Sequence, residues 1–288
     1  MSDDAHDPLG ASRESTPVKA PPPAGGERMV LQASERRLRA NQSHTLSRIV
    51  SGERLRRLVD HRLDLLRLWL DSFPHGLYQP VDLPARSAKR ATGTRSRWEQ
   101  IRRVVKRCAP ATAMDLGANA GFFSIQLGRL GVRTLAVDSE RATLRMASMA
   151  IRRSGQDNVA LMQLELTPGA AELLPHVDAS LFLSVWHHLV RHQGIDDATA
   201  ITERIWERTA KVMFFDSGED EMDASFGLPA LEPTAEAWYA DYLSRVCAGS
   251  RVEHLGRHDA FDGAGNPCRR NLFAVIREQV ATTSTAMR

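Results

Sequence analysis

The feature that most constrains the fold is a regular alternation of strand-like and helix-like segments from residue 111 onward. Five short apolar runs are spaced so that a helix fits into each gap. Such alternation is typical of a parallel sheet whose faces are covered by helices. Two later extended runs flank the turn-rich stretch 262–267 and predict a closing antiparallel pair. The expected strands lie at 111–116, 133–137, 159–164, 179–185 and 211–215, followed by 251–258 and 271–276.

Composition divides the chain into four predicted parts. Residues 1–26 are polar and rich in proline, which indicates a disordered tail. Residues 27–95 are expected to form a helical extension and linker, 96–280 the α/β domain and 281–288 a flexible C-terminus. In the extension, apolar residues recur at three- and four-residue intervals and predict an amphipathic helix. Its apolar stripe comprises Leu55, Leu58, Val59, Leu63, Leu66 and Leu70.

Several arginines of this helix lie off the apolar stripe. They are Arg54, Arg57, Arg62 and Arg67. Charged residues in such positions commonly form a solvated face. The alternative is that they contact an anionic substrate or partner.

A second helix is expected immediately before the first strand. Ser96 and Glu99 have the Ser-x-x-Glu spacing of a capping box, which predicts that this helix begins near Arg97. Its inner face would then carry Trp98, Ile101, Val105 and Cys108.

Composition also limits the compartment. The three cysteines have no regular spacing, so we expect neither a disulfide scaffold nor a structural zinc site, and a reducing environment fits best. No positively charged start followed by an apolar run is present, and no segment reaches the ~18 apolar residues of a membrane span. We therefore expect a cytoplasmic protein. The net charge of +3 does not by itself indicate a nucleic-acid partner.

A glycine-containing loop after the first expected strand indicates a ligand site. Gly117 and Gly121 allow the backbone to bend sharply and a ligand to approach closely. Asn119 tolerates the positive φ that the middle of such a loop requires. Asp138 ends the second strand, 21 residues after Gly117, where a carboxylate can accept hydrogen bonds from both hydroxyls of a ribose.

The loop distinguishes between two classes of nucleotide cofactor. A nicotinamide dinucleotide site has the pattern Gly-x-Gly-x-x-Gly, whose last glycine permits close packing beside a pyrophosphate. Phe122 occupies that position here. Its ring fits poorly beside a pyrophosphate, whereas S-adenosylmethionine carries no phosphate. The spacing therefore favours S-adenosylmethionine over NAD.

The run from Asp115 to Gly121 resembles the first motif of class I S-adenosylmethionine-dependent methyltransferases, and Asp138 resembles their ribose-binding acid. The resemblance covers roughly residues 96–277. It implies a Rossmann-like α/β fold with a seven-stranded, mostly parallel sheet and an antiparallel last strand. It also implies that Glu165 or Leu166 flanks the adenine. The loop residues expected around the cofactor are Asp115, Gly117, Asn119, Gly121 and Phe122.

Two histidines follow the fourth expected strand, where cofactor and acceptor should meet. The sequence from Ser184 to His188 departs from the Asn-Pro-Pro-Tyr signature of methyltransferases that act on exocyclic or amide nitrogen. We expect His187 or His188 to act as general base or to orient the acceptor. We prefer His187, because His188 begins the next helix. The alternative is that both imidazoles are structural.

Other polar residues near these strand ends have open roles. Asp216 and Glu219 could bind acceptor hydroxyls or cap the following segment. His188, His192 and Asp216 do not complete a convincing set of metal ligands, so no metal is expected.

Three short elements are similar to bacterial glycan O-methyltransferase domains: Tyr78-Gln79, Arg97-Trp98 and the Ser-Val-x-His-His strand end at Ser184. The similarity implies that Tyr78 and Arg97 close over the cofactor, and we also place Ser184 beside it. The predicted function is S-adenosylmethionine-dependent O-methylation of a hydroxylated small molecule or saccharide by histidine-assisted in-line transfer. An RNA methyltransferase that grips phosphates with its arginine-rich N-terminal half is one alternative. A non-catalytic methyltransferase-like binding module is the other.

Overall fold

The computed structural model describes residues 52, 59, 62, 63, 79–81, 91–219, 221–261 and 266–278. The chain divides into two compact units, Met1–Leu63 and Asp64–Arg288. The described residues of the first unit are helical, and they are Gly52, Val59, Arg62 and Leu63. The sheet and the site belong to the second unit. Predictions that lie outside the described residues concern the tail 1–26, Arg54, Arg57, Arg67, Tyr78 and the segment 281–288.

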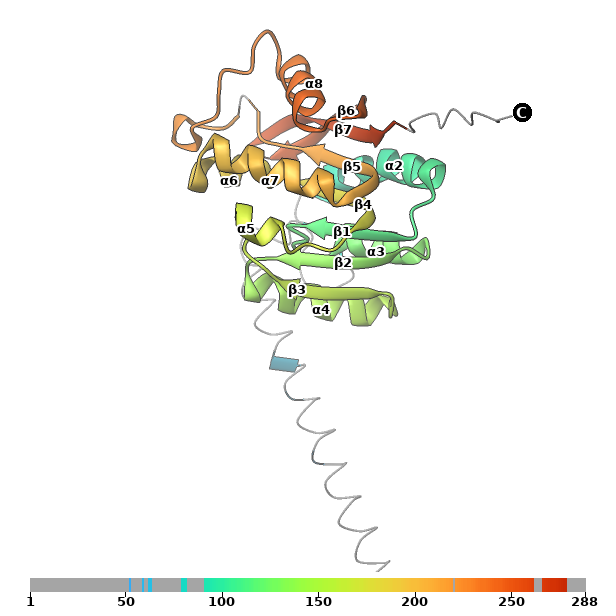
Figure 1. Ribbon diagram of the computed structural model, residues 1–288. Coiled ribbons are helices and arrows are strands. Elements are labelled where there is room, and N and C mark those ends of the chain that lie inside the picture. The colour runs from blue at the N-terminus through green and yellow to red at the C-terminus, as the bar shows by residue number, and fades with distance from the viewer. Residues whose placement is uncertain are drawn as a thin grey trace, which may run out of the picture. The chain divides into compact units, whose positions relative to one another are not determined.

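A seven-stranded sheet forms the centre of the second unit (Figure 1). Its order is β3-β2-β1-β4-β5-β7-β6, with β1 to β5 parallel and β7 antiparallel to both β5 and β6. The predicted fold class is therefore confirmed. The strands are β1 (Thr112–Leu116), β2 (Arg133–Asp138), β3 (Val159–Gln163), β4 (Val177–Leu183), β5 (Thr209–Asp216), β6 (Ser250–Phe261) and β7 (Pro267–Arg277).

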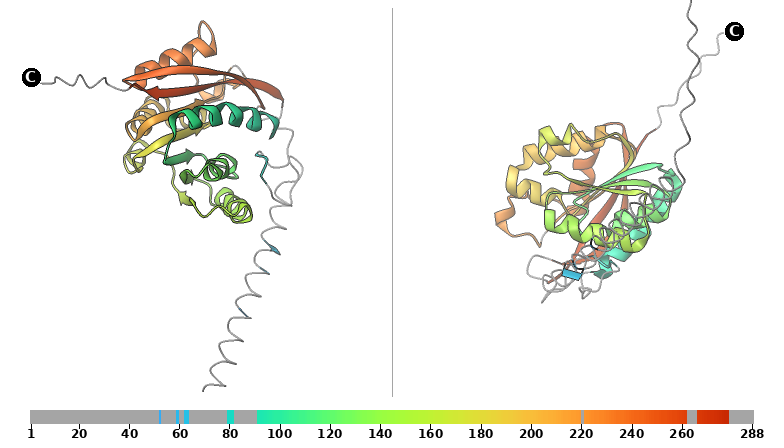
Figure 2. Two further views of the ribbon diagram at one scale, coloured as in Figure 1. Left: turned by 90° about the vertical axis from the view of Figure 1, so that its right-hand side faces the viewer. Right: turned by 90° about the horizontal axis from the view of Figure 1, so that it is seen from below.

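Helices cover both faces of the sheet (Figure 2). One face carries α2 (Ala91–Cys108), α3 (Phe122–Arg129) and α4 (Arg141–Ser154). The other carries α5 (Pro168–Ala171), α6 (Trp186–Gln193), α7 (Ile195–Glu207) and α8 (Ala235–Val246), and the short 3-10 helix η1 (Ala224–Phe226) packs against α6.

Strand β4 shows how this arrangement buries apolar side chains on both faces. Leu181 and Leu183 belong to the core beneath α2 and α3, whereas Phe182 belongs to the core beneath α6 to α8. Successive side chains of a strand point to opposite faces, so a strand covered on both sides is apolar throughout. The continuous apolar runs in the sequence reflect this double cover.

Helix α2 begins earlier than the capping-box pattern predicted. It starts at Ala91, so Ser96 lies inside the helix and is not its N-cap. The Ser96 hydroxyl donates to the carbonyl oxygen of Gly93 at 3.1 Å and lies 2.9 Å from His258 Nδ1 on β6. A tertiary contact thus uses the hydroxyl that the local pattern assigned to capping. The predicted inner face is confirmed for Trp98, Ile101 and Val105, which are buried.

Gly93 brings α2 into close contact with β6. A Cβ atom at this position would collide with the backbone carbonyl oxygen of Asp259. We expect Gly93→Ala to lower the free energy of unfolding by about 1–3 kcal/mol through overpacking. Helix propensity alone predicts the opposite, because alanine in a helix interior is favoured over glycine by about 1 kcal/mol.

Chemical denaturation measures the free energy of unfolding of Gly93→Ala and of a control variant. Gly169→Ala, in α5, is the matched control because its added Cβ would meet open space. We expect this control to be as stable as the parent protein or slightly more stable. A stabilised Gly93→Ala variant would contradict the close contact between α2 and β6.

Candidate functional site

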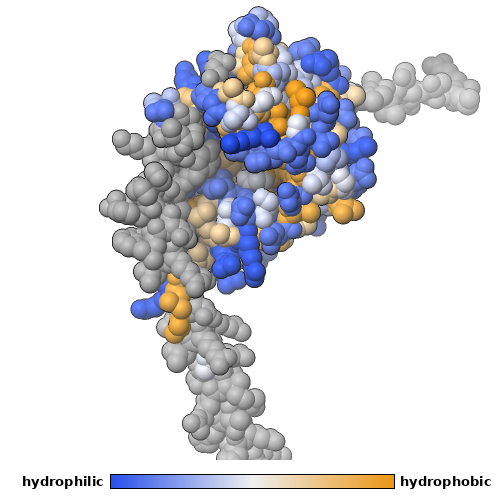
Figure 3. All heavy atoms as spheres, turned by 90° about the vertical axis from the view of Figure 1, so that its left-hand side faces the viewer, coloured by the Kyte–Doolittle hydropathy of each residue, from blue (hydrophilic) through white to orange (hydrophobic). Residues whose placement is uncertain are grey.

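A cavity of about 620 Å³ lies at the carboxyl ends of the parallel strands. Figure 3 looks onto this side of the molecule, where polar side chains are abundant on the surface. In open α/β sheets, ligands bind at this edge, where the loops after the strands meet. Most of the residues predicted from the sequence line the cavity: Arg97, Asp115, Gly117, Asn119, Asp138, Glu165, Ser184, His187 and His188.

Two predicted loop residues, Gly121 and Phe122, do not line the cavity. A Cβ atom at Gly121 would lie 3.5 Å from Ala147 of α4, so this glycine faces the helix. Phe122 is buried, and its backbone N–H donates to Gln79 Oε1 at 2.9 Å. Phe123 lines the cavity in its place. Tyr78 lies outside the described residues, but its neighbour Gln79 also lines the cavity.

The glycine loop has the backbone that its sequence predicted. Gly117, Asn119 and Gly121 adopt positive φ angles of 72°, 52° and 82°. Gly117 is required for a second reason, since a Cβ atom there would collide with Val185 Cγ2. The loop thus bends sharply and lies tightly against the end of β4.

Asp138 anchors the loop to the end of β2. Its Oδ2 accepts a hydrogen bond from the Asn119 N–H and its Oδ1 accepts one from the Glu140 N–H, both at 3.0 Å. A carboxylate has about four acceptor positions, so two remain for donors within the cavity.

Asp115 is a buried carboxyl group at the floor of the cavity. The Ser124 hydroxyl donates to its Oδ2 at 2.6 Å. Burial raises the pKa of Asp115 to about 6, and the hydrogen bond from Ser124 opposes only part of that rise. The charge of Asp138 adds to the rise. A bound cation would favour the ionised form of Asp115.

His187 is buried and held in one tautomer. The backbone N–H of Gly218 donates to its Nδ1 at 2.9 Å, so the lone pair of Nδ1 is used and the proton of the neutral ring is assigned to Nε2. Burial lowers the pKa of His187 well below its ordinary value, and the charges of Arg270 and His188 act in the same direction. His187 is therefore a neutral imidazole that can donate from Nε2.

His188 has a different environment. Its side chain is exposed at the cavity, and its ring centroid lies 4.2 Å from that of His187 and 5.9 Å from that of Phe226. No hydrogen bond joins its imidazole to another residue in the described part of the chain. Partial burial is the main cause that lowers the pKa of His188. Electrostatic interactions with Arg270, His192 and Arg191 lower it further. It is thus a neutral ring with an accessible lone pair.

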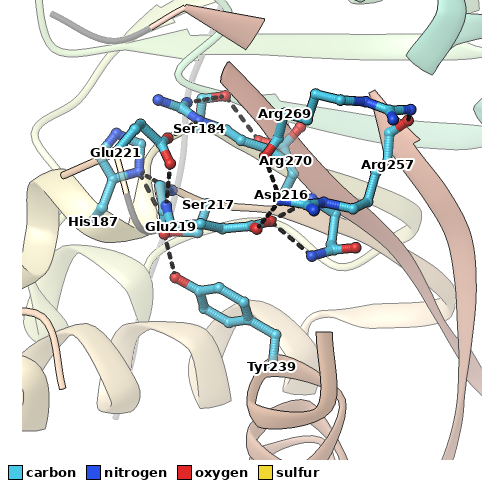
Figure 4. A network of polar contacts seen from close by, with 12 residues as sticks. Ser184, His187, Asp216, Ser217, Glu219, Glu221, Tyr239, Arg257, Arg269 and Arg270 are labelled. Carbon is cyan, nitrogen blue, oxygen red and sulfur yellow. Dashed lines mark hydrogen bonds and ion pairs between the residues drawn. The ribbon is translucent and has the colours of Figure 1, made fainter. Parts of the chain in front are cut away.

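A buried polar network lies behind the histidines (Figure 4). Arg97 Nη1 is 2.6 Å from Asp216 Oδ2, and the Ser184 hydroxyl donates to Asp216 Oδ1 at 2.8 Å. Arg270 donates to the same hydroxyl at 3.3 Å, and its Nε lies 2.6 Å from Glu221 Oε1. Ser184 has a φ of 58°, a strained angle for a residue other than glycine.

Asp216 and Glu219 take a role that differs from the two considered for them, which were binding acceptor hydroxyls and capping the following segment. Asp216 is buried with its carboxylate bound to Arg97 and Ser184. Glu219 accepts hydrogen bonds from both the backbone and the side chain of Asn271. Neither residue lines the cavity, so both serve the polar network. Sequence reasoning missed Arg270, Met222 and Phe226 as lining residues because their contacts connect distant parts of the chain.

Two features are absent from the described residues. These residues contain no group of three or more histidine, cysteine, aspartate or glutamate residues that could hold a metal ion. Among the same residues, no helix combines the length and apolar character needed to span a membrane.

Comparison with known proteins relates the chain to methyltransferases. No protein-family model matches it. Over 106 residues, or 36% of the chain, it is 26% identical to the O-antigen chain terminator bifunctional methyltransferase/kinase WbdD of Escherichia coli, and it covers 15% of that protein. A crystal structure of WbdD superposes with a TM-score of 0.54 at 20% identity, covering 73% of this chain and 46% of WbdD. Another, with an ordered C-terminal bundle, gives 0.55 at 20% identity and covers 76% and 42%.

The strand order and this structural similarity together decide the architecture. The chain has the class I methyltransferase fold. The resemblance predicted from the glycine loop and Asp138 is thereby confirmed at the level of the fold. The chain spans less than half the length of the WbdD structures it matches. Within the methyltransferase fold, the glycine loop follows β1 and Asp138 ends β2.

The raised pKa of Asp115 predicts a pH-dependent contribution to stability. A carboxyl group whose pKa is higher in the folded state stabilises the protein fully below its unfolded pKa of 3.8 and loses this contribution as pH rises through about 6. Asp115→Asn removes that loss. We expect the variant to gain about 1–2 kcal/mol relative to the parent protein between pH 5 and 7.5.

Urea denaturation of both proteins at the two pH values measures this gain. Comparing the difference between the proteins cancels the titration of the other carboxyl groups. A difference that does not change with pH would show that Asp115 titrates in the folded protein as it does in the unfolded chain.

Proposed function

We propose that this chain is an S-adenosylmethionine-dependent methyltransferase that methylates an oxygen of a hydroxylated small molecule or saccharide. The observation that carries the proposal is the composition of one cavity. The glycine loop and Asp138 line it together with His187 and His188. A cofactor site and a proton acceptor therefore share one cavity.

The carboxylates beside the glycine loop suit a ligand that carries positive charge and a ribose. Asp138 retains acceptor positions for two hydroxyls, and Asp115 lies at the cavity floor. Val137, Leu164 and Leu166 provide apolar walls, with Glu165 beside them, for an adenine ring. Arg97, at the wall toward Ser184, offers a guanidinium to the carboxylate of the methionine moiety. The bound cofactor supplies the sulfonium methyl group.

The two histidines take different parts in this proposal. The His187 tautomer leaves no lone pair facing the cavity, because Nδ1 accepts from Gly218 and Nε2 carries the proton. His188 has an accessible lone pair and is the better general base. This assignment reverses the preference drawn from the sequence. His187 packs against the His188 ring and fixes its orientation.

The chemistry requires alignment and the removal of a proton. Methyl transfer is an in-line displacement, so holding the acceptor oxygen in line contributes through proximity and orientation. His188 would accept the hydroxyl proton as the carbon–oxygen bond forms and the bond between the methyl carbon and the donor sulfur breaks. A general base typically contributes 10²–10⁴-fold to the rate.

The saccharide part of the proposal is supported by the partial sequence similarity to WbdD, which is described as an O-antigen chain terminator. Radiolabelled methyl transfer from S-adenosylmethionine to fractionated extracts of the source cell tests it. Label in a glycan or hydroxylated metabolite supports the proposed acceptor. Label confined to RNA, or cofactor binding without any transfer, would exclude it.

Cofactor binding is predicted to depend on Asp138. We expect S-adenosylmethionine to bind in calorimetric titration and NAD not to bind. Asp138→Asn should weaken S-adenosylmethionine binding by about 1–3 kcal/mol, because two ribose hydroxyls lose a charged acceptor. Asp178→Asn is the matched control, since Asp178 accepts hydrogen bonds from the backbone N–H groups of Ala111 and Thr112 and does not line the cavity. Equal affinities for the two variants would refute the ribose assignment.

The histidine roles predict different kinetics for the two alanine variants. His188→Ala should retain cofactor affinity and lose about 10²–10⁴-fold in kcat. His187→Ala should lose stability, because a buried ring that packs against the ring of His188 is removed. Since the pKa of His188 is lowered, the fall in rate on acidification should lie below the ordinary histidine value of about 6.5.

Measurement of kcat against pH, with the labelled extract fraction as acceptor, checks this assignment. The acidic fall in rate should disappear in His188→Ala. Wild-type turnover in both variants would mean that catalysis proceeds by positioning alone.

A further inference from the structure

Arg270 brings a buried positive charge to the cavity from the end of the chain. It lies on β7, only 6% of its side chain is exposed, and it lines the cavity together with His187 and His188. Two contacts hold its guanidinium in place, at 2.6 Å from Nε to Glu221 Oε1 and at 3.3 Å from Nη1 to the Ser184 hydroxyl. A guanidinium carries its charge at every accessible pH.

The charged and titratable groups around His188 come from three elements. Helix α6 contributes Arg191 and the imidazoles of His187 and His192, and β7 contributes Arg270. The segment leading into η1 contributes two acids, Glu221 and Asp223. Glu221 is bound to Arg270, and Asp223 interacts with Arg191. No acid therefore faces the His188 imidazole directly among these described groups.

We propose that Arg270 is a positioning residue that keeps the resting His188 imidazole unprotonated, by holding a fixed positive charge in the cavity that the histidine pair lines. The catalytic meaning of this inference rests on the proposed function. A positive charge near an imidazole disfavours its protonated form. In support, burial lowers the pKa of both His188 and His187, and the charge of Arg270 lowers it further.

Glu221 tunes the strength of this effect. Its carboxylate offsets part of the Arg270 charge while fixing the direction of the guanidinium. Removing Arg270 and removing Glu221 should therefore move the titration of His188 in opposite directions. A purely structural salt bridge gives no reason for opposite signs, so the pair of variants separates the two roles.

Histidine titration followed by nuclear magnetic resonance of the ligand-free protein, with labelled imidazoles, tests the inference. Arg270→Gln should move the midpoint of His188 upward, toward the ordinary value of about 6.5. Arg270→Lys should retain the low midpoint. Glu221→Gln should move it further downward, which also tests the inference if Arg270→Gln does not fold.

Arg269→Gln is the matched control on the same strand. Its side chain is 61% exposed and interacts with Asp259, away from the cavity. We expect this variant to leave the His188 midpoint unchanged. An Arg270→Gln midpoint equal to that of the control, or a Glu221→Gln midpoint that does not fall, would overturn the inference.

This experiment is separable from the proposed function. The titration needs neither cofactor nor acceptor, so it can fail while methyl transfer is observed. Conversely, absence of cofactor binding in the parent protein would remove the proposed function without changing the midpoints. If both hold, the acidic fall in the methyl-transfer rate of Arg270→Gln should shift upward with the midpoint.

Discussion

The buried interaction among Arg97, Asp216 and Ser184 is the constraint on which the site depends. It joins α2 to the ends of β4 and β5, which are far apart in sequence. Removing one partner of a buried ion pair typically costs about 3–5 kcal/mol, because the other charge is left uncompensated. The pair thus holds the cavity wall in one arrangement. It also involves Ser184, whose backbone is left-handed and which lies three residues before His187.

Burial in the cavity shifts the pKa values of its acidic and basic groups in opposite directions. Burial disfavours charge, so it raises the pKa of Asp115 and lowers the pKa of His187 and His188. The carboxyl group of Asp115 therefore favours a cation as its ligand, because a cation restores the ionised carboxylate. The histidines of the same cavity present neutral imidazoles. This polarity suits a reaction in which a positively charged methyl donor meets a hydroxyl that must lose its proton.

Local sequence patterns predicted the sheet and the glycine loop well, because both depend on interactions between near neighbours. The five parallel strands begin and end within two residues of their predicted positions. Asn119 adopts the positive φ expected of it. The predicted start of α2 was wrong. Ser96 forms a hydrogen bond with His258, 162 residues away, and a local capping pattern carries no information about such a contact. The roles of the two histidines likewise depend on Gly218 and Arg270.

The sequence by itself determined the fold class, the position of the loop and a set of site residues, most of which line the cavity. Periodicity, glycine conformation and strand ends are local properties, so a single chain displays them. Only the tertiary structure decided the state of each ionisable group. The tautomer of His187, the charge beside His188 and the burial of Asp216 arise where β4, β5, β7 and α2 meet. Hydrogen bonds and electrostatic fields depend on distance in space, which sequence separation does not reveal.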